Sequence, residues 1–232
     1  MRRKKSRAQL TKCKSRRELE NATKAVKVTM KIFDGISSPF GRTERDVAHE
    51  IRSMAKSLGA GLAFQPIVAS GSSSGYVHHR PSSKMVREDE PVIFDIGFKT
   101  GCQCSDVTRM HTPNNERDRK LLKDVLSIQR KCIAMARPGT TLKEINDEFR
   151  RLMRLKRYRV RHSIGHGLGS VVHERVKGPL QPGMVITIEP GVYFRKKRGC
   201  RVEDMVLITR GKPRVLTKSI VFKPSRPRQK QH

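Results

Sequence analysis

The feature of this chain that most constrains its fold is an order of structural signals that occurs twice. In the first half, the capping box Ser15-x-x-Glu18 precedes apolar residues at helical spacing, which predicts an amphipathic helix over 16–34. A second helix is expected after the cap residue Thr43, and strand patterns interrupted by loops then occupy about 62–110. The first half is therefore expected to form two helices followed by strands.

The second half repeats that order. A third helix is expected over 114–136, and Pro138-Gly139 just after it prevents the helix from continuing. The capping box Thr141-x-x-Glu144 begins a fourth helix. Strand patterns separated by glycine and proline turns make up the last third of the chain. Two helices followed by strands, twice over, predict a duplicated α+β fold with helices packed on one face of a sheet.

The charge of the chain is strongly positive. The 232 residues suit one large domain, and we expect a disordered basic arm over 1–14, a folded domain over 15–219 and a basic tail over 220–232. Lys and Arg number 51 against 21 acidic residues, a net charge of +30. Such a surface attracts polyanions, so non-specific association with RNA or DNA is predicted. A solvated basic coat without a dedicated target is the alternative, because only three Tyr and no Trp are available for base stacking.

The cysteine content and the hydropathy of the chain predict the cellular compartment of the protein. Five cysteines, an odd number without zinc-ribbon spacing, predict free thiols in a reducing compartment. No apolar run approaches the roughly 20 residues of a membrane span, and no signal-peptide core follows the basic N-terminus. We therefore expect a cytoplasmic protein that does not enter the membrane. The sequence carries no signal for an oligomeric state.

Four carboxylates lie within apolar strand patterns, although acidic residues are scarce in this chain. They are Asp95 in "VIFDIG", Asp106 in "CSDVTR", Glu189 in "VITIEPG" and Glu203 in "CRVEDMVLIT". A lone carboxylate in a buried strand is unfavourable unless it is paired, hydrogen-bonded or bound to a metal. Four carboxylates in such strands therefore require a shared positive charge that compensates them.

Hairpin geometry predicts that these carboxylates form pairs. A two-residue turn at 100–101 in "FDIGFKTGCQCSD" would place Asp95 opposite Asp106, with Cβ atoms roughly 4.5–5.5 Å apart. A second hairpin, with its loop near "RKKRG", would bring Glu189 and Glu203 together. Opposed ionised carboxylates repel each other but suit two cations about 3.5–4 Å apart. An Asp pair that shares a proton is the alternative, and it leaves the two Glu unexplained.

Histidines are concentrated in "HSIGHGLGSVVHE", where His162, His166 and His173 alternate with glycines and apolar residues. The spacing of His162 and His166 matches a helical zinc pair, but the glycines disfavour a helix. Hydrogen-bonded structural histidines are the alternative to a functional site. Four carboxylates and one histidine form an oxygen-rich ligand set, which favours Mn, Co or Fe over a structural thiolate zinc site.

Seven sequence motifs point to a known family. The series "PIVASG", "VHH", "FDIG", "CSDVTR", "HSIGHGLGSVVHE", "PGMVITIEPGVY" and "RVEDMVLIT" closely resembles the Xaa-Pro aminopeptidase/prolidase branch of the methionine aminopeptidase family. The resemblance runs from about residue 17 to 217 and covers the catalytic domain of that branch. It implies the pita-bread (creatinase/aminopeptidase) fold, in which two helix-helix-strands halves are related by pseudo-two-fold symmetry.

The resemblance also implies a site. The family's metal ligands fall on Asp95, Asp106, His166, Glu189 and Glu203. The residues that match catalytic or substrate-binding positions are His78, His162, His173, Tyr193 and Arg201. For Arg201, a simple charge partner of a ligand carboxylate is the alternative. Two divalent ions are implied, Mn in the first place with Co, Fe or Zn as alternatives. The implied hydrolase activity cleaves the N-terminal bond of Xaa-Pro peptides through a metal-bridging hydroxide, with Glu189 shuttling the proton.

Two alternative functions stay open. A methionine aminopeptidase shares the five ligands, but His162 four residues before His166 and Gly191-Val192-Tyr193 after the Glu-Pro pair point away from it. A catalytically inactive pita-bread protein that binds RNA or ribosomes would account for the positive charge. Retention of four unfavourable buried carboxylates argues against this second alternative.

Overall fold

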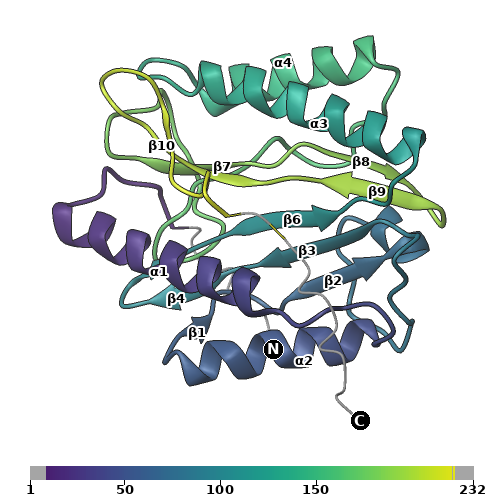
Figure 1. The fold of residues 1–232 in the computed structure, drawn as a ribbon. Helices are drawn as coiled ribbons and strands as arrows, with labels where there is room; N and C mark the ends of the chain where they lie inside the picture. Colours follow the sequence, from purple (N-terminus) through teal and green to yellow (C-terminus); the bar gives the residue numbers. More distant parts are fainter. Residues whose placement is uncertain (1–8, 221, 223–232) are drawn as a thin grey trace, which may run out of the picture.

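The computed structural model describes residues 9–220 and 222, and it shows the two-fold repetition that the sequence predicts (Figure 1). The first half contains the elements α1 (Arg16–Gly35), α2 (Glu44–Ser57), β1 (Gly61–Leu62), β2 (Ile67–Ser70), the 3-10 helix η1 (Gly71–Gly75), β3 (Val92–Ile96), β4 (Phe98–Thr100), β5 (Gln103–Cys104) and β6 (Val107–His111). The second half contains α3 (Glu116–Met135), α4 (Leu142–Leu155), β7 (Val185–Ile188), β8 (Gly191–Phe194), β9 (Arg198–Arg201), β10 (Asp204–Leu207) and β11 (Arg214–Val215).

The four helices begin where the sequence predicts. Ser15 and Thr141 each accept a hydrogen bond from the backbone N–H three residues on, and Glu18 and Glu144 accept one from the backbone N–H of the cap residue in return. These reciprocal bonds satisfy amide groups that have no partner inside the helix. The expected helices over 16–34, after Thr43, over 114–136 and from Thr141 are therefore confirmed to within a few residues. None of the helices in the described part of the chain has the length and apolar character of a membrane span.

The described residues form two hydrophobic cores, and the core of the first half also includes second-half side chains such as Leu168, Val185 and Met205. All strand pairs in the described residues are antiparallel, in the orders β2-β3-β6, β1-β4-β5, β11-β10-β7 and β8-β9. In the first half, α1 packs on β4 and β5 while α2 packs on β1 and β2; in the second, α3 packs on β7, β8 and β9. Figure 1 shows the strands between the helix pair α3–α4 and the helices α1 and α2. The largest fully buried side chains of the two cores are Phe33, Phe94, Phe98 and Phe149.

The register of the first hairpin differs from the prediction by two residues. Asp95 lies opposite Thr108, and Lys99 lies opposite Cys104. The turn is formed by Gly101-Cys102 rather than by 100–101, because glycine takes the first central position with φ +56°, a conformation that favours glycine. A shift of two residues keeps every side chain on its expected face of the sheet. Asp95 and Asp106 are therefore diagonal neighbours on one face, and the prediction that they are directly opposed is wrong.

The second hairpin has the predicted register. Gly191 pairs with Arg201 in the β8–β9 ladder, and Ile188 pairs with Asp204 in the β7–β10 ladder. The two ladders share one register across the strand breaks. Glu189 and Glu203, which lie in these breaks between the ladders, therefore face each other. Lys196 in the connecting turn has φ +59°. The prediction that this hairpin brings the two glutamates together is confirmed.

The expected ends of the folded domain differ from the structure. Residues 1–8, 221 and 223–232 lie outside the described residues, but Thr11, expected in a disordered arm, donates its backbone N–H to Arg175 O at 3.0 Å. The buried ammonium of Lys14 forms an ion pair with Glu174 at 3.2 Å. At the other end, Ile220 is buried rather than part of a tail. Hydrogen bonds and an ion pair with the second half order the segment 9–14, for which sequence composition alone predicted disorder.

Candidate active site

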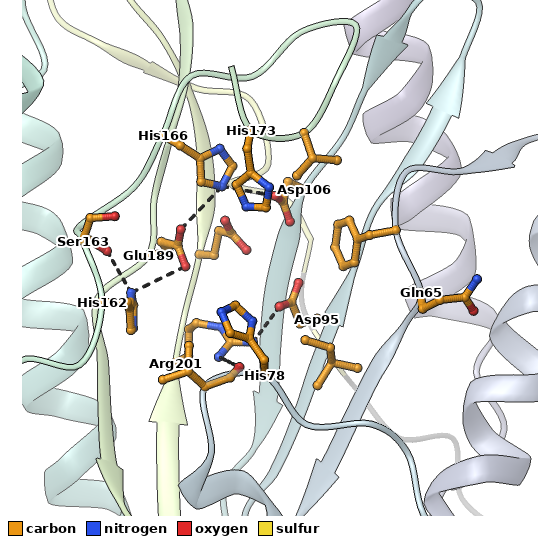
Figure 2. Close-up of a pocket in the computed structure, with 15 residues that line it drawn as sticks. Gln65, His78, Asp95, Asp106, His162, Ser163, His166, His173, Glu189 and Arg201 are labelled. Atoms are coloured by element: carbon orange, nitrogen blue, oxygen red, sulfur yellow. Dashed lines mark hydrogen bonds and ion pairs between the residues drawn. The ribbon is translucent and has the colours of Figure 1, made fainter. Parts of the chain in front are cut away.

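A cavity of about 390 Å³ is lined by residues from both halves of the fold (Figure 2). Every predicted site residue except Tyr193 lines it. The full set of lining residues is Phe64, Gln65, Ile67, Val77, His78, Asp95, Asp106, His162, Ser163, His166, Val172, His173, Glu189, Arg201 and Glu203. The cavity therefore combines an apolar wall from the first half with the carboxylates and histidines that the sequence singled out.

Interruptions of the strands aim the carboxylates into this cavity. Asp106 lies between β5 and β6, Glu189 between β7 and β8, and Glu203 between β9 and β10. Asp95, by contrast, is in the middle of β3. A break in a ladder re-aims the side chain beside it, which is why such irregularities are common next to functional sites. Pro190, which cannot donate to a ladder, is the sequence signal for the break after Glu189.

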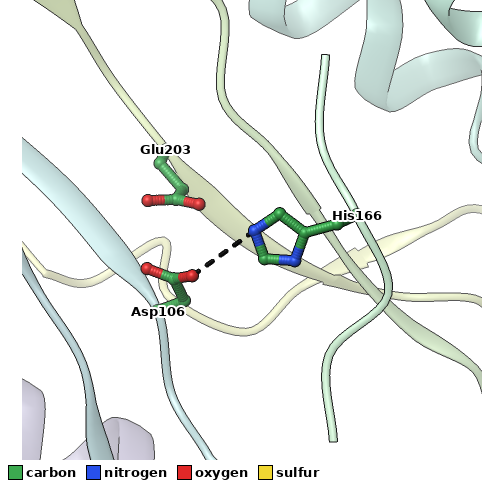
Figure 3. Close-up of side chains that lie close together, drawn as sticks. All are labelled: Asp106, His166 and Glu203. Carbon is green, nitrogen blue, oxygen red and sulfur yellow. Dashed lines mark ion pairs between the residues drawn. The ribbon is translucent and has the colours of Figure 1, made fainter. Parts of the chain in front are cut away.

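Asp106, His166 and Glu203 form the tightest cluster of potential ligand atoms in the described residues. One atom from each lies within 4.8 Å of the other two (Figure 3). His166 Nε2 lies 3.5 Å from Asp106 Oδ2 and 3.5 Å from Glu189 Oε1. Both distances are too long for good hydrogen bonds. The His166 nitrogen thus lies close to the carboxylate oxygens without forming a good hydrogen bond to Asp106 or Glu189.

The protonation of His166 makes this arrangement suitable for a cation. Its Nδ1 lies 3.0 Å from the carbonyl oxygen of Gly167, which can only accept, so Nδ1 carries the proton. Burial lowers the pKa of His166 to about 4, so the ring is neutral near pH 7 and Nε2 presents a lone pair. That lone pair faces carboxylate oxygens, which are also electron-rich. A cation between them satisfies all three groups.

Burial and mutual repulsion disfavour the ionised carboxylates. The pKa of Asp106 is raised well above its usual range by burial and then by the charges of Asp95 and Glu189. Burial likewise raises the pKa of Glu189 to about 8. The pKa of Glu203 is raised by burial and by the neighbouring carboxylates, Asp106 first. Without a cation these groups therefore tend to hold protons, and a divalent cation between them would favour the ionised forms.

Asp95 has one satisfied oxygen and one unsatisfied oxygen. Its Oδ2 accepts a hydrogen bond from Arg201 Nη2 at 2.6 Å, whereas Oδ1 is buried and has no hydrogen-bond partner among the described residues. A buried carboxylate oxygen without a protein partner is rare in native proteins, and an ion or a water usually satisfies it. With the lone pair of His166, it supports the fit of the predicted ligand residues to bound cations.

Arg201 acts as a charge partner of Asp95, which is the alternative that the sequence left open. The guanidinium also donates to Thr108 Oγ1 at 3.1 Å, to Tyr193 OH at 2.8 Å and to the carbonyl oxygen of Val77 at 3.2 Å. Thr108 in turn donates to Glu203 Oε2 at 2.9 Å. Sequence reasoning missed Thr108, although its position two residues after Asp106 on the same face of the strand was a usable signal.

Tyr193, for which the resemblance implies a substrate-binding role, does not line the cavity. It is buried behind the cavity wall, where its hydroxyl accepts from Arg201 and lies 3.0 Å from His162 Nε2. His162 Nδ1 bonds to the carbonyl oxygen of Ser163 at 2.8 Å, so Nε2 accepts the Tyr193 proton. Burial lowers the pKa of His162 to about 4. Tyr193 therefore holds the His162 ring in place and does not line the cavity.

The two remaining histidines face the cavity with free ring nitrogens. Neither His78 nor His173 forms a side-chain hydrogen bond with a described residue, and both line the cavity. The His173 ring lies against that of His166, with 4.3 Å between ring centroids. The structure thus brings all the predicted histidines to one site, with His78 and His173 available to a ligand.

Comparisons with known proteins agree with this geometry. The chain is 36% identical over 222 residues to the Xaa-Pro dipeptidase of Pyrococcus furiosus, a match that covers 89% of this chain and 63% of that protein. The prolidase structure from Pyrococcus horikoshii aligns with a TM-score of 0.81 at 35% identity, over 92% of this chain and 64% of that one. The prolidase from Thermococcus sibiricus aligns with a TM-score of 0.83 at 33% identity, over 93% and 61%.

These similarities establish the pita-bread fold that the motifs implied, with its duplicated halves. The chain spans about 63% of the length of the curated Xaa-Pro dipeptidases that it matches. The family description that matches residues 16–210 is that of metallopeptidase family M24. Because that match covers most of the chain and includes all the cavity's carboxylates and histidines, the chain belongs to metallopeptidase family M24.

Proposed function

We propose that this chain is a metallo-aminopeptidase or dipeptidase that hydrolyses the N-terminal peptide bond of Xaa-Pro peptides. The observation that carries the proposal is the cluster of Asp106, His166 and Glu203, with Asp95 and Glu189 beside it, in a cavity open to a small peptide. The similarity to an Xaa-Pro dipeptidase at 36% identity supports the substrate class. The cytoplasmic location expected from the cysteines stays a prediction.

Two divalent cations would be held by Asp95, Asp106, His166, Glu189 and Glu203. The unpartnered Asp95 Oδ1 and the lone pair of His166 Nε2 support this ligand set. Four carboxylates and one imidazole favour Mn over softer metals, with Co, Fe or Zn as alternatives. When bound, such ions supply an activated water nucleophile and polarise the carbonyl group of the scissile bond.

The side chains of this protein would divide the remaining work of the reaction. Glu189 would take a proton from the attacking water and deliver it to the leaving nitrogen, because its carboxylate borders both His162 and His166. His78 and His173, whose ring nitrogens have no partner among the described residues, would donate to the peptide and stabilise the charge that develops on it. Tyr193 and Arg201 would act by positioning His162 and Asp95.

Binding of Mn to the metal-free protein is expected to release protons and to strengthen as pH rises towards 8. Burial raises the pKa of Glu189 to about 8, so this group is protonated at pH 6.5 and a cation must displace its proton. Affinity should therefore rise by up to about tenfold per pH unit for each displaced proton. His166 does not contribute, since its lowered pKa of about 4 leaves it neutral. Calorimetric titrations in buffers of different ionisation enthalpy measure the protons, and identical heats in all buffers would contradict the expectation.

Peptides with proline in the second position are expected to be cleaved faster than Met-Ala peptides by at least about tenfold in kcat/KM, a difference of ~1.4 kcal/mol. Proline forms a tertiary amide without an N–H, so a pocket built for secondary amides does not suit it automatically. The measurement uses Ala-Pro, Ala-Pro-Ala, Met-Pro-Ala, Met-Ala-Ala and Ala-Ala-Ala with Mn and with Co. The ratio of the first two rates separates dipeptidase from aminopeptidase activity.

The variant His162→Ala should erode the preference for proline and leave metal content unchanged, whereas His49→Ala, on the exposed face of α2, should change neither. Faster release of methionine from Met-Ala-Ala with both metals would favour a methionine aminopeptidase. Absence of hydrolysis with Mn, Co, Fe and Zn would favour a protein without catalytic activity.

A further inference from the structure

A second cavity, of about 300 Å³, lies at the C-terminal end of α4 and is lined mainly by arginines. Its lining residues are Arg150, Arg154, Arg157, Tyr158, Arg159 and Val160. None of these described lining residues is acidic, and all four arginines are exposed. Four guanidinium groups around one hollow repel each other, so the cavity is complementary to an anion.

The four arginines have no side-chain hydrogen bond or ion pair with any described residue. Adjacent basic residues do have such partners: Arg151 pairs with Glu148 at 2.6 Å and Lys156 with Asp124 at 2.5 Å. Arg157 has φ +59°, a left-handed conformation that turns the chain sharply just after the helix. The acidic residues nearby are thus paired elsewhere, and the arginines remain available.

The basic surface continues onto the turn between β8 and β9. Tyr158 donates to Asp124 at 2.8 Å, and its ring lies edge-on to that of Phe194, with 6.4 Å between ring centroids. Phe194 is 37% exposed and is followed by the exposed residues 195–197, Arg-Lys-Lys, whose side chains have no partner among the described residues. Figure 1 shows the end of α4 and the β8–β9 turn on the same side of the molecule.

Successive side chains of β8 point to opposite faces of the strand, and this separates the basic surface from the peptide cavity. Tyr193 is buried and bonds to His162 and Arg201, whereas the next residue, Phe194, points to the outer face. An occupant of the outer face therefore need not enter the peptide cavity.

We propose that the arginine cavity and the turn 195–197 form a binding site for single-stranded RNA. Guanidinium groups bind phosphate through paired N–H donors, so the cavity holds one phosphate and the turn a neighbouring one. The exposed ring of Phe194 between them provides a platform on which a base stacks. A positive groove with an aromatic side chain is the arrangement by which single strands are bound without sequence preference. The concave shape suits a discrete phosphate better than a flat membrane surface.

The test uses fluorescence anisotropy of a labelled single-stranded 12-mer RNA with the full chain at low salt. The double variant Arg154→Gln/Arg157→Gln is expected to weaken binding at least about tenfold. It should also lower the slope of log K against log salt by about 0.7, the value for the one phosphate that the cavity no longer neutralises. Phe194→Ala is expected to weaken binding about tenfold because a base can no longer stack on the ring. Hydrolysis of Ala-Pro and the melting temperature should stay at wild-type values in these variants.

The matched control is Arg17→Gln/Arg45→Gln, which removes two exposed arginines of the first half that form no side-chain hydrogen bond or ion pair with a described residue. It should change RNA binding by less than about twofold, although it removes the same charge. An equal reduction in the control would show that only the overall charge attracts RNA and would overturn the proposal. Unchanged binding by the Arg154/Arg157 variant would also overturn it, as would stronger binding to phosphatidylserine vesicles than to RNA that depends on the same two arginines.

Discussion

Replacement of Asp106 by asparagine is expected to lower kcat/KM for Ala-Pro peptides by about 10³-fold or more, roughly 4 kcal/mol of transition-state stabilisation. Asp106 is 4% exposed, and its Oδ2 lies 3.5 Å from His166 Nε2. Asparagine preserves the shape of the side chain but removes the negative charge and one ligand oxygen. The variant should therefore bind less than two equivalents of divalent metal.

The stability of this variant distinguishes a metal ligand from a structural residue. In the metal-free protein, removal of one carboxylate relieves its repulsion with Asp95 and Glu189, so Asp106→Asn should melt at the same or a higher temperature than the wild type. With Mn the order should reverse, since a ligand at 100 times its Kd stabilises a protein by about 2.7 kcal/mol. Asp204→Asn is the control: Asp204 bonds to Arg109 and Thr217, so its variant should lose stability and keep its metal. Wild-type turnover and metal content in Asp106→Asn would refute the ligand assignment.

Replacement of Arg201 by leucine is expected to lower the free energy of unfolding of the metal-free protein by about 3–5 kcal/mol. Arg201 is 3% exposed and donates to Asp95 at 2.6 Å, to Thr108 and to Tyr193. Its removal leaves Asp95 with no hydrogen bond on either oxygen among the described residues. Urea denaturation of chelator-treated protein measures the change.

A double-mutant cycle tests the reason for this destabilisation. The pair Arg201→Leu/Asp95→Asn should regain a large part of the stability, because the uncompensated buried charge is removed. Addition of Mn should reduce the cost of Arg201→Leu alone, since the cations supply positive charge beside Asp95. If Arg201→Leu alone lowers the free energy of unfolding by less than about 1 kcal/mol, Arg201 is not the principal partner of Asp95.

The helices could be predicted from the sequence because their determinants are local. Capping boxes and apolar spacing depend on residues three or four positions apart, and they located the start of α1 and α4 correctly. The β8–β9 hairpin was predictable for a similar reason, since its short turn fixes the alignment of Glu189 with Glu203. The carboxylates themselves stood out because ionisable residues are unexpected in apolar strands.

Other features depend on contacts that the sequence does not display. The choice between a turn at 100–101 and one at 101–102 is a matter of one backbone conformation at Gly101, and both alternatives match the apolar pattern equally well. Thr108 and Tyr193 gain their positions from Arg201, which lies far from Thr108 in the chain. The order of residues 9–14 depends on Glu174 and Arg175, more than 150 residues away.

The pairing of residues 9–14 with the second half of the chain has a consequence for folding during synthesis. Lys14 and Glu174 are separated by 160 positions, so the ribosome makes residues 9–14 long before their partners. At roughly 5–20 residues per second, the segment waits on the order of ten seconds or more for the second half to appear. Contacts of such large sequence separation form late and slow the folding of a domain. The ion pair between Lys14 and Glu174 can therefore form only after the hairpin that carries Asp95 and Asp106 has been synthesised.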